Sequence, residues 1–253
     1  MSALLEVSAL YKRFGTLAAV SNLSLSVERG EVVGVIGANG AGKTTFVNMV
    51  TGYLAPSSGR IAFSGREITG RPPRQIAKAG IARSFQVPQV FASASVIDNL
   101  LIAFGVAEDG RLPIWSPLRR RGREERAMAM LEAYGIASYS EEPASLLPQG
   151  VRKLLDIAMA TVREPDLLLL DEPTSGISAR EKFAIMDRIM TVLEEQKTTI
   201  LFIEHDMEII GRYARRVLAF ADGFIIADGP PAKVIDDPEV RRLVVGERVK
   251  AAR

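Results

Sequence analysis

Residues 37–44 read GANGAGKT, a complete match to the pattern G-x-x-x-x-G-K-[ST]. The pattern follows EVVGVIG (31–37), a nearly continuous run of apolar and β-branched residues that is typical of a strand buried on both faces. A helix is expected immediately afterwards, over Thr45–Thr51. This order of strand, turn and helix constrains the chain more than any other feature, and it predicts an α/β fold with a mostly parallel sheet.

Such a loop suits polyphosphate, whose oxygens carry several negative charges and need many hydrogen-bond donors in a small volume. Glycines let the backbone curl with its N–H groups inward, and the helix N-terminus adds its positive dipole end. Lys43 supplies charge to the β- and γ-phosphates, and the Thr44 hydroxyl is placed for Mg²⁺. The predicted binding residues are Gly37, Asn39, Gly40, Ala41, Gly42, Lys43, Thr44 and Thr45. A glycine-rich turn without a ligand is the alternative, and its flanking elements weaken it.

Two carboxylates follow a second buried strand, DLLLLDE (166–172). At the carboxyl edge of a parallel sheet, next to the phosphate loop, Asp171 can hold Mg²⁺ directly or through water. Glu172 can then polarise the attacking water as a general base. A strand end that only meets solvent is the alternative, and pairing with a phosphate loop makes it the weaker one.

The remaining patterns divide the chain into a core and an insertion. TTILFIE (198–204) is a third buried strand, LLEVSAL (4–10) and LSLSV (23–27) alternate like antiparallel strands, and ADGFIIADGPP (221–231) predicts short strands and a turn. Two amphipathic helices are expected from residues Val151, Leu154, Leu155, Ala158 and Val162 and from residues Phe183, Met186, Ile189, Met190 and Leu193. We therefore expect an NTPase core with an antiparallel β part over about 1–86 and 146–253.

The middle of the chain differs, because it has helical patterns and no continuous buried strand. The patterns lie over Val96–Phe104 and Glu124–Tyr134, so residues of about 87–145 are expected to form a helical subdomain. Between them DGRLPIWSPLRRRGRE (109–124) combines glycine, proline and a basic run, which predicts a surface loop or hinge.

Composition excludes several kinds of chemistry. The chain has no cysteine, so disulfides, thiolate metal sites and cysteine nucleophiles are excluded, and with one histidine, His205, a multi-histidine metal site is impossible. The net charge of +2 gives no argument for a nucleic-acid partner. No run of eighteen apolar residues and no signal peptide are present, so we expect a soluble intracellular chain.

The order of these motifs resembles the nucleotide-binding subunit of ABC transporters over nearly the whole chain. Gln86, in ARSFQ, matches that family's Q-loop glutamine, which the resemblance assigns to Mg²⁺, the attacking water and coupling to the membrane partner. His205, in FIEHDM, matches the switch histidine at the γ-phosphate. Phe14, in KRFG, matches the aromatic that stacks on adenine, and Ser175–Ser178 occupy the D-loop position. Taken alone, these would be a solvated glutamine, a strand-end histidine and a core phenylalanine. The resemblance implies ATP and Mg²⁺ as cofactors.

One segment departs from the family. Its signature usually reads LSGGQ, whereas residues 147–151 read LPQGV. In the family the serine hydroxyl and glycine N–H groups bind the γ-phosphate of ATP held by the opposite subunit, and Pro148 offers neither group. Gly150 and the positive end of a helix starting near Val151 remain. We expect weaker or differently arranged closure of an ATP-bound dimer.

The resemblance is greatest to the branched-chain amino acid importers, the LivG-like group, in ARSFQVPQVFASASVIDNL (82–100), the basic insertion and the tail from Asp228. It implies membrane permease subunits as partners, a second ATPase subunit that is identical or LivF-like, and indirectly a periplasmic solute-binding protein. It also implies peripheral attachment to the cytoplasmic face of the inner membrane. The docking face is expected around Gln86–Phe91 and the helices after Ser95. As solute, the resemblance implies branched-chain amino acids or a related small polar or aromatic compound.

Several alternatives stay open at this point. An exporter cassette of the lipid or lipopolysaccharide type shares a similar core, and a non-transport ABC ATPase or a module that has lost hydrolysis are further possibilities. The basic run Arg119–Arg123 beside Trp115 has two interpretations, a solvated loop or contact with anionic lipid headgroups.

Overall fold

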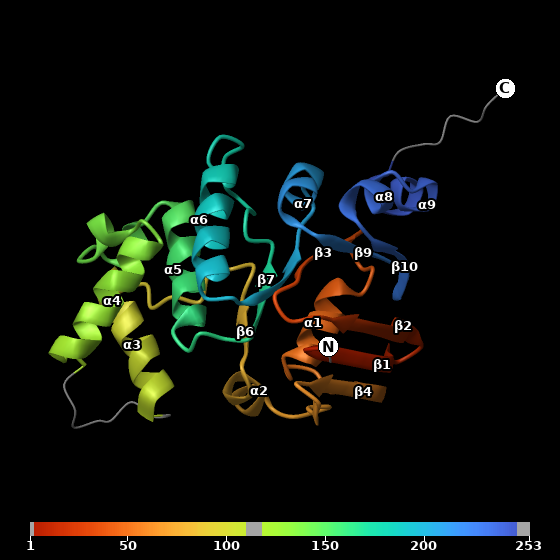
Figure 1. Cartoon of the computed structure of the whole chain (residues 1–253), viewed down its shortest axis with the longest axis horizontal. Coiled ribbons are helices and arrows are strands. Elements are labelled where there is room, and N and C mark those ends of the chain that lie inside the picture. Colours follow the sequence, from red (N-terminus) through yellow and green to blue (C-terminus); the bar gives the residue numbers. More distant parts are fainter. Residues whose placement is uncertain (1–2, 110–117, 247–253) are drawn as a thin grey trace. The chain divides into compact units, whose positions relative to one another are not determined.

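The computed structural model describes residues 3–109 and 118–246 (Figure 1). Two compact units divide the chain. The first unit comprises residues 1–81 and 199–253, and the second comprises residues 82–198. The second unit is therefore inserted into the sequence of the first.

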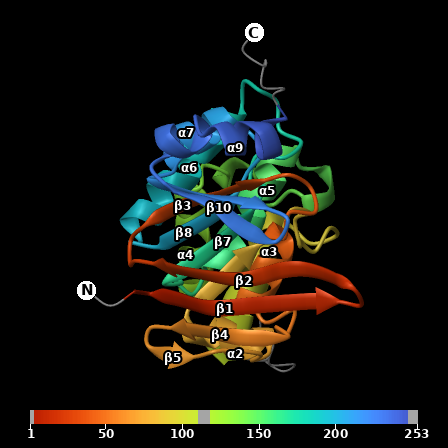
Figure 2. The same cartoon turned by 90° about the vertical axis from the view of Figure 1, so that its right-hand side faces the viewer.

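The first unit begins with an antiparallel sheet in the order β2-β1-β4-β5 (Figure 2). Its strands are β1 (Leu5–Phe14), β2 (Leu17–Val27), β4 (Ser58–Phe63) and β5 (Arg66–Glu67). A tight turn joins the first two strands, with Phe14 opposite Leu17 and Leu5 opposite Val27. Alternate residues such as Leu5 and Val7 are buried. The antiparallel strands expected over 4–10 and 23–27 are therefore confirmed, as parts of β1 and β2.

Four further strands of the first unit lie in the order β10-β9-β3-β8. They are β3 (Val32–Gly37), β8 (Thr199–Ile203), β9 (Arg216–Ala221) and β10 (Phe224–Gly229). Strand β3 is parallel to both β8 and β9, and β10 is antiparallel to β9. Every residue of β3 and β8 is buried, as a strand covered on both faces requires. The α/β expectation is confirmed.

Helices connect and cover these strands. They are α1 (Lys43–Val50), α2 (Pro73–Ala79), α7 (Met207–Tyr213), α8 (Pro231–Ile235) and α9 (Pro238–Val240), followed by the π-helical turn η3 (Arg241–Val245). The Phe46 and Phe220 rings lie 5.7 Å apart between centroids, which packs α1 against β9. This contact fixes the helix that follows the glycine-rich loop.

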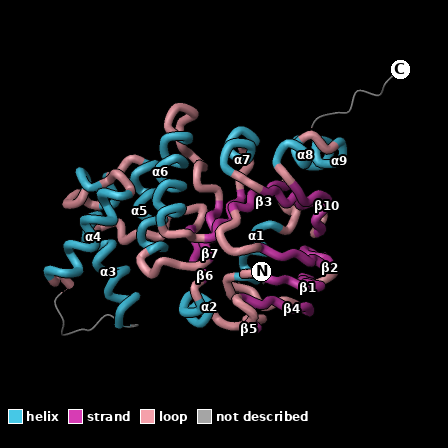
Figure 3. The backbone as a smooth tube through the Cα atoms, viewed as in Figure 1, coloured by secondary structure: helices cyan, strands magenta, loops and turns pink. Residues whose placement is uncertain are grey.

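The second unit is rich in helices (Figure 3). Strands β6 (Ile81–Ser84), which begins one residue before the unit, and β7 (Leu167–Asp171) are hydrogen-bonded neighbours. The helices are α3 (Val96–Asp109), α4 (Arg121–Ala133), α5 (Gln149–Thr161) and α6 (Lys182–Glu195), with 3₁₀ turns η1 (Ala137–Tyr139) and η2 (Ala144–Leu146). Helices α5 and α6 confirm the two amphipathic patterns, and α5 begins two residues earlier than expected. In the described part of the chain no helix is long and apolar enough to span a bilayer.

The basic segment before α4 was predicted wrongly in part. Helix α4 begins at Arg121, within the expected loop 109–124 and three residues before the expected helix. Arg123 is buried and pairs with Glu108 at 2.7 Å, and Arg119 pairs with Asp98 at 3.0 Å. Burial of Arg123 in its pair with Glu108 contradicts a solvated loop at this position, whereas Arg119 and Arg120, before the helix, are exposed as that interpretation expects. Trp115 lies outside the described residues.

Candidate functional site

The glycine-rich loop joins β3 to α1 in the first unit. Ala38, Asn39 and Gly40 are exposed at its tip, and the Ala41 N–H donates to the Ala38 carbonyl oxygen at 3.1 Å. Helix α1 starts at Lys43, directly after Gly42. The predicted strand, loop and helix are therefore all present, and the N-terminal end of α1 adjoins the exposed loop.

Glycine is required at Gly42 for two reasons. Its φ of +102° is a conformation that other residues rarely adopt, and a Cβ there would lie 2.5 Å from the Ala19 carbonyl oxygen of β2. The Gly40 φ is +84°, but a Cβ at this tip position would meet open space. The loop's shape thus depends on a close approach of backbone to backbone at one glycine and on conformational freedom alone at the other.

The loop lysine lies across the loop. The Lys43 side chain is buried, and its ammonium donates to the carbonyl oxygens of Gly37 and Ala38, the latter at 3.0 Å. Thr44 is exposed and Thr45 is half-buried in the first turn of α1. A concentrated positive charge and an exposed hydroxyl thus lie where the loop meets the helix, as the motif predicts.

His205 lies at the same edge of the sheet as this loop. Strands β3 and β8 are parallel neighbours, with Val35 opposite Ile203, so their carboxyl ends lie side by side. His205 follows β8 and is exposed, while the next residue, Asp206, caps α7 by accepting from the Glu208 and Ile209 N–H groups. The histidine is therefore held between a strand end and a capped helix, facing outward.

Phe14 ends β1, and its side chain is 48% exposed. That exposure excludes the interpretation of an ordinary core phenylalanine. The Lys12 ammonium lies 5.2 Å from the ring centroid and is itself tied to the Ala55 carbonyl oxygen at 2.7 Å. An exposed aromatic ring held in this way is suited to stacking on a planar base.

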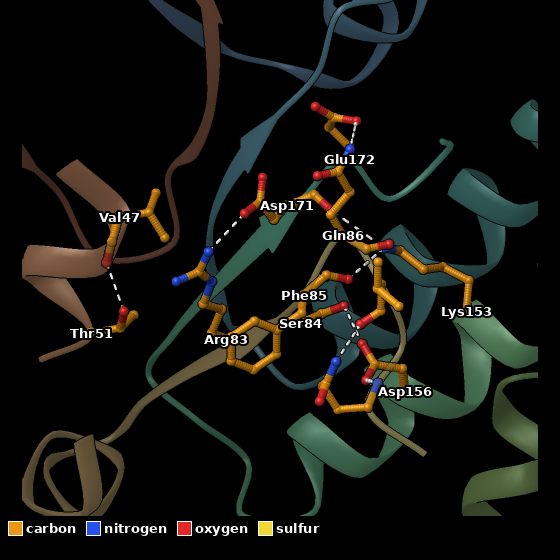
Figure 4. A network of polar contacts seen from close by, with 12 residues as sticks. Val47, Thr51, Arg83, Ser84, Phe85, Gln86, Lys153, Asp156, Asp171 and Glu172 are labelled. Carbon is orange, nitrogen blue, oxygen red and sulfur yellow. Dashed lines mark hydrogen bonds and ion pairs between the residues drawn. The ribbon is translucent and has the colours of Figure 1, made fainter. Parts of the chain in front are cut away.

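In the second unit, the structure brings together residues that the sequence names separately. The Gln86 Nε2 donates to the Glu172 Oε2 at 2.7 Å (Figure 4). Asp171 is the last residue of β7, and Glu172 follows it with a φ of +48°. Left-handed backbone is uncommon for glutamate, and such strained positions concentrate at functional sites. Gln86, Asp171 and Glu172 thus form one cluster at the end of a buried strand.

Arg83 belongs to this cluster and was not predicted. Its Nη2 lies 2.7 Å from the Asp171 Oδ2, with both side chains nearly buried, and its guanidinium lies 4.7 Å from the Phe85 ring centroid. A buried carboxylate needs a cationic or hydrogen-bonding partner, and Arg83 supplies it through one carboxylate oxygen. The sequence offered one signal for this role, because Arg83 lies in a short strand, three residues before Gln86.

The departing signature segment also has a defined geometry. Gly150 lies in the first turn of α5, where a Cβ would overlap the Ile185 side chain of α6. The Gln149 Nε2 donates to the Ser175 carbonyl oxygen at 3.2 Å. A Cβ at Gly176 would overlap the Gln149 amide. The signature and D-loop positions of this chain are therefore in direct contact.

The donor set suits Mg²⁺. In the second unit, the Gln86 amide and the Asp171 carboxylate bring oxygen atoms to the end of β7. These are hard oxygen ligands, and Mg²⁺ takes one or two such protein groups together with water and phosphate oxygens. The Arg83 Nη2 lies against one oxygen of the Asp171 carboxylate, so the other oxygen is not used by this pair.

Comparison with known proteins agrees with this geometry. Residues 20–175 match the family described as ABC transporter. The chain is 37% identical over 250 residues to the high-affinity branched-chain amino acid transport ATP-binding protein LivG of Salmonella typhimurium, covering 96% of this chain and 98% of LivG. It is 36% identical over 253 residues, with the same shares covered, to the corresponding protein BraF of Pseudomonas aeruginosa.

A solved structure is similar from end to end. It is MJ1267, an ATP-binding cassette of an ABC transporter in its ADP conformation, with a TM-score of 0.87 and 30% identity. The match covers 98% of this chain and 100% of that one. Family, relatives and fold agree, and the chain belongs to the ABC transporter family as an ATP-binding ATPase subunit.

Proposed function

We propose that this subunit hydrolyses ATP to drive uptake of branched-chain amino acids, or of a related small polar or aromatic solute, through a separate permease. The assignment of ATP hydrolysis rests on the 2.7 Å hydrogen bond between Gln86 and Glu172, the residue that follows Asp171. Identity of 36–37% over nearly the whole chain to LivG and BraF supports the transport part. The same likeness favours import over the exporter and non-transport alternatives.

Nucleotide binding is assigned to the first unit. Phe14 stacks on the adenine, and the N–H groups of the loop together with the N-terminus of α1 surround the phosphates. The Lys43 ammonium, which lies against two carbonyl oxygens of the loop, contacts the β- and γ-phosphates. His205, exposed at the adjacent strand end, contacts the γ-phosphate.

Hydrolysis is assigned to the cluster in the second unit. Glu172 accepts a proton from the attacking water, and the Gln86 amide holds the Glu172 carboxylate in position for this. Thr44, Gln86 and Asp171 would hold Mg²⁺, which when bound neutralises charge on the β- and γ-phosphate oxygens. Arg83 fixes the position of the Asp171 carboxylate through its 2.7 Å contact.

A second ATPase subunit completes the site. Gly150 and the N-terminus of α5 from one chain face the γ-phosphate bound by the other, so closing the pair excludes water from two nucleotides. The second subunit is identical or LivF-like. Because residue 148 is proline, which lacks both a hydroxyl and an N–H, closure rests on Gly150 and the helix end.

ATP-binding subunits of ABC transporters work with membrane permease subunits. Here the exposed side chains of Val87 and Phe91, close to Gln86 in sequence, are assigned to permease docking, at the cytoplasmic face of the inner membrane. A periplasmic solute-binding protein delivers the solute from the other side. Release of the γ-phosphate then opens the pair and passes motion to the permease.

The catalytic part is tested with Glu172→Gln. We expect kcat for ATP hydrolysis to fall at least ~100-fold, because a general base is removed, while the Kd for ATP stays within about 2-fold. The variant is also expected to dimerise in saturating ATP, alone or mixed with a LivF-like subunit, in sedimentation velocity experiments. Hydrolysis within 2-fold of wild type would remove Glu172 from the proposed role.

The transport part is tested by uptake. Cells that lack this chain should lose accumulation of radiolabelled leucine, isoleucine or valine, or of one of the related solutes, and regain it with the wild-type chain. Cells that carry Glu172→Gln serve as the control and should stay deficient. Uptake of every solute at the wild-type rate in the deleted cells would contradict the assignment.

A further inference from the structure

Helix α5 carries two charged residues on its buried face, one helical turn apart. Lys153 is 2% exposed and Asp156 is 5% exposed, and they are interspersed with the buried Leu154, Leu155 and Ile157. Lysine and aspartate are almost never buried so completely unless hydrogen-bonded partners compensate the charge. The contacts of these two side chains therefore indicate their role.

The Lys153 ammonium donates to three backbone carbonyl oxygens (Figure 4). They belong to Phe85 at 2.7 Å, Gln86 at 3.2 Å and Asp171 at 3.3 Å. An ammonium has three N–H donors and no acceptor, so these contacts match its capacity. One buried cation thereby joins the main chain at both Gln86 and Asp171.

Asp156 holds the same segment from the next turn of α5. Its Oδ2 accepts from the Ser84 Oγ at 2.6 Å, and its Oδ1 accepts from the Gln89 N–H at 2.7 Å. Burial raises the pKa of the Asp156 carboxyl, and its hydrogen bonds to Ser84 and Gln89 oppose that rise. The segment Ser84–Gln89, here called the Gln86 segment, is therefore fixed to α5 on both sides of Gln86.

We propose that Lys153 is a positioning residue for ATP hydrolysis, which fixes the Gln86–Glu172 pair through the main chain at Gln86 and Asp171. This inference rests on the proposed catalytic roles of Gln86, Asp171 and Glu172. Lys153 holds the backbone from which Gln86 and Glu172 project, through the carbonyl oxygens of Gln86 and Asp171. A displacement of about 1 Å at such groups costs on the order of 100-fold in rate.

Lys153→Met tests the inference, because methionine keeps the apolar length and helix propensity and removes all three donors. We expect kcat for ATP hydrolysis by the full-length chain to fall by about 10- to 100-fold. The KM and the Kd for ATP are expected to change less than about 3-fold, because the phosphate loop belongs to the first unit. A kcat within 2-fold of wild type would overturn the proposal.

Tyr134→Phe is the matched control for loss of a buried hydrogen bond next to α5. The Tyr134 hydroxyl lies 3.0 Å from the Thr161 Oγ1, at the end of α5 remote from Gly150, with both side chains buried. This variant lowers stability without touching the Gln86 segment, so its kcat should equal that of wild type. An equal loss of kcat in both variants at matched thermal stability would reduce Lys153 to a structural role and overturn the proposal.

Chemical rescue separates the ammonium from the space it fills. The chain contains no cysteine, so Lys153→Cys introduces a single thiol. Aminoethylation of that thiol in denaturant, followed by refolding, rebuilds a lysine-like ammonium, whereas propylation gives a neutral side chain of the same length. We expect the aminoethylated chain to reach within about 3-fold of refolded wild type and the propylated chain to remain deficient. Equal activity of the two alkylated chains would overturn the proposal.

Glu172→Gln, measured in the same assay, distinguishes failure of this inference from failure of the proposed function. If Glu172→Gln hydrolyses ATP like wild type, the catalytic cluster itself is misassigned. If Glu172→Gln is inactive and Lys153→Met is fully active, only the positioning role of Lys153 is wrong.

Discussion

The phosphate loop and the Gln86 segment are built in opposite ways. The phosphate loop is shaped by backbone: Gly42 has a φ of +102° and leaves no space for a Cβ beside Ala19. The Gln86 segment is shaped by buried side chains, with Lys153 and Asp156 holding it from helix α5. The phosphate loop depends on small residues within the loop itself. The Gln86 segment depends on charged residues that are far from it in the sequence.

This difference predicts different failures. A backbone-shaped loop tolerates almost no added atoms at its crowded glycine, because both the conformation and the space are lost together. A segment held by charged side chains loses specific contacts instead, so conservative substitutions reduce its function by degrees. Substitutions in the two regions should therefore separate nucleotide affinity from the rate of hydrolysis.

Gly42→Ala is expected to have the largest effect of the substitutions below. The added Cβ meets the Ala19 carbonyl oxygen at 2.5 Å in a left-handed conformation, so we expect about 3 kcal/mol of destabilisation and at least ~100-fold weaker ATP binding. Gly40→Ala is the control, since a Cβ there meets open space, and it should cost about 1 kcal/mol. Urea denaturation without nucleotide measures the loss of stability in both variants, and titration with ATP measures the Kd. Equal costs would show that crowding at Gly42 is unimportant.

Phe14→Ala removes the aromatic ring that we assign to stacking on the adenine, in the first unit. Loss of stacking on the base should raise the Kd for ATP about 10-fold, equivalent to about 1.4 kcal/mol. The Kd for inorganic tripolyphosphate, which has no base, should change less than 2-fold in the same titrations. Weaker binding of both ligands to the same extent would mean that Phe14 shapes the loop and does not stack.

Arg123→Met tests a charged pair of the second unit that lies outside the catalytic cluster. We expect about 1 kcal/mol of destabilisation at pH 7 and unchanged ATP hydrolysis, because the substitution removes the pair with Glu108, the 3.4 Å hydrogen bond to the Leu118 carbonyl oxygen and local packing, all outside the catalytic cluster. The hydrogen bond from Arg123 lowers the pKa of Glu108, so this stabilisation exists above the usual glutamate pKa and is lost as pH falls through the lowered value.

The stability difference between wild type and Arg123→Met should accordingly shrink below about pH 4.3. Thermal unfolding at a series of pH values measures it. A difference that stays constant down to pH 2 would show that packing, and not the ion pair, provides the stabilisation.

Asp156→Asn is expected to have the smallest effect, below about 1 kcal/mol at pH 7, since asparagine can keep a hydrogen bond to the Gln89 N–H. Burial raises the pKa of Asp156, so the folded state binds its proton more readily than the unfolded state does. Wild type should therefore gain stability relative to Asp156→Asn as pH falls from 7 toward about 3.9. A difference that is independent of pH in urea denaturation would contradict this.

The strand, loop and helix around residues 37–44 could be predicted almost completely, because eight consecutive residues determine the conformation of the loop. The buried strands and the helices α5 and α6 were equally accessible, since their periodicity is local. The Gln86–Glu172 contact was accessible only through the family resemblance, because 86 positions separate the two residues and no spacing rule links them.

Arg83, Lys153 and Asp156 were missed for the same physical reason. Each is a charge with a partner between 67 and 88 positions away, at Asp171 for Arg83 and in the Gln86 segment for the others, and Lys153 also reaches the Asp171 carbonyl oxygen, 18 positions away. A charge on the apolar face of a predicted helix is the signal that sequence alone offers for such contacts. Arg123 was misread because a run of arginines looks solvated, whereas Glu108, the carboxylate that pairs with it, belongs to helix α3.

The contact between Gly150 and Ile185 has an evolutionary consequence. The Ile185 side chain fills the space that any Cβ at position 150 would need, so the two positions share one volume. Alanine or serine at position 150 would require the Ile185 Cδ1 methyl group, 2.4 Å from such a Cβ, to turn away, or a shorter side chain at position 185. Paired variation at the two positions would mark helix α6 as a constraint on which residues the signature segment can accept.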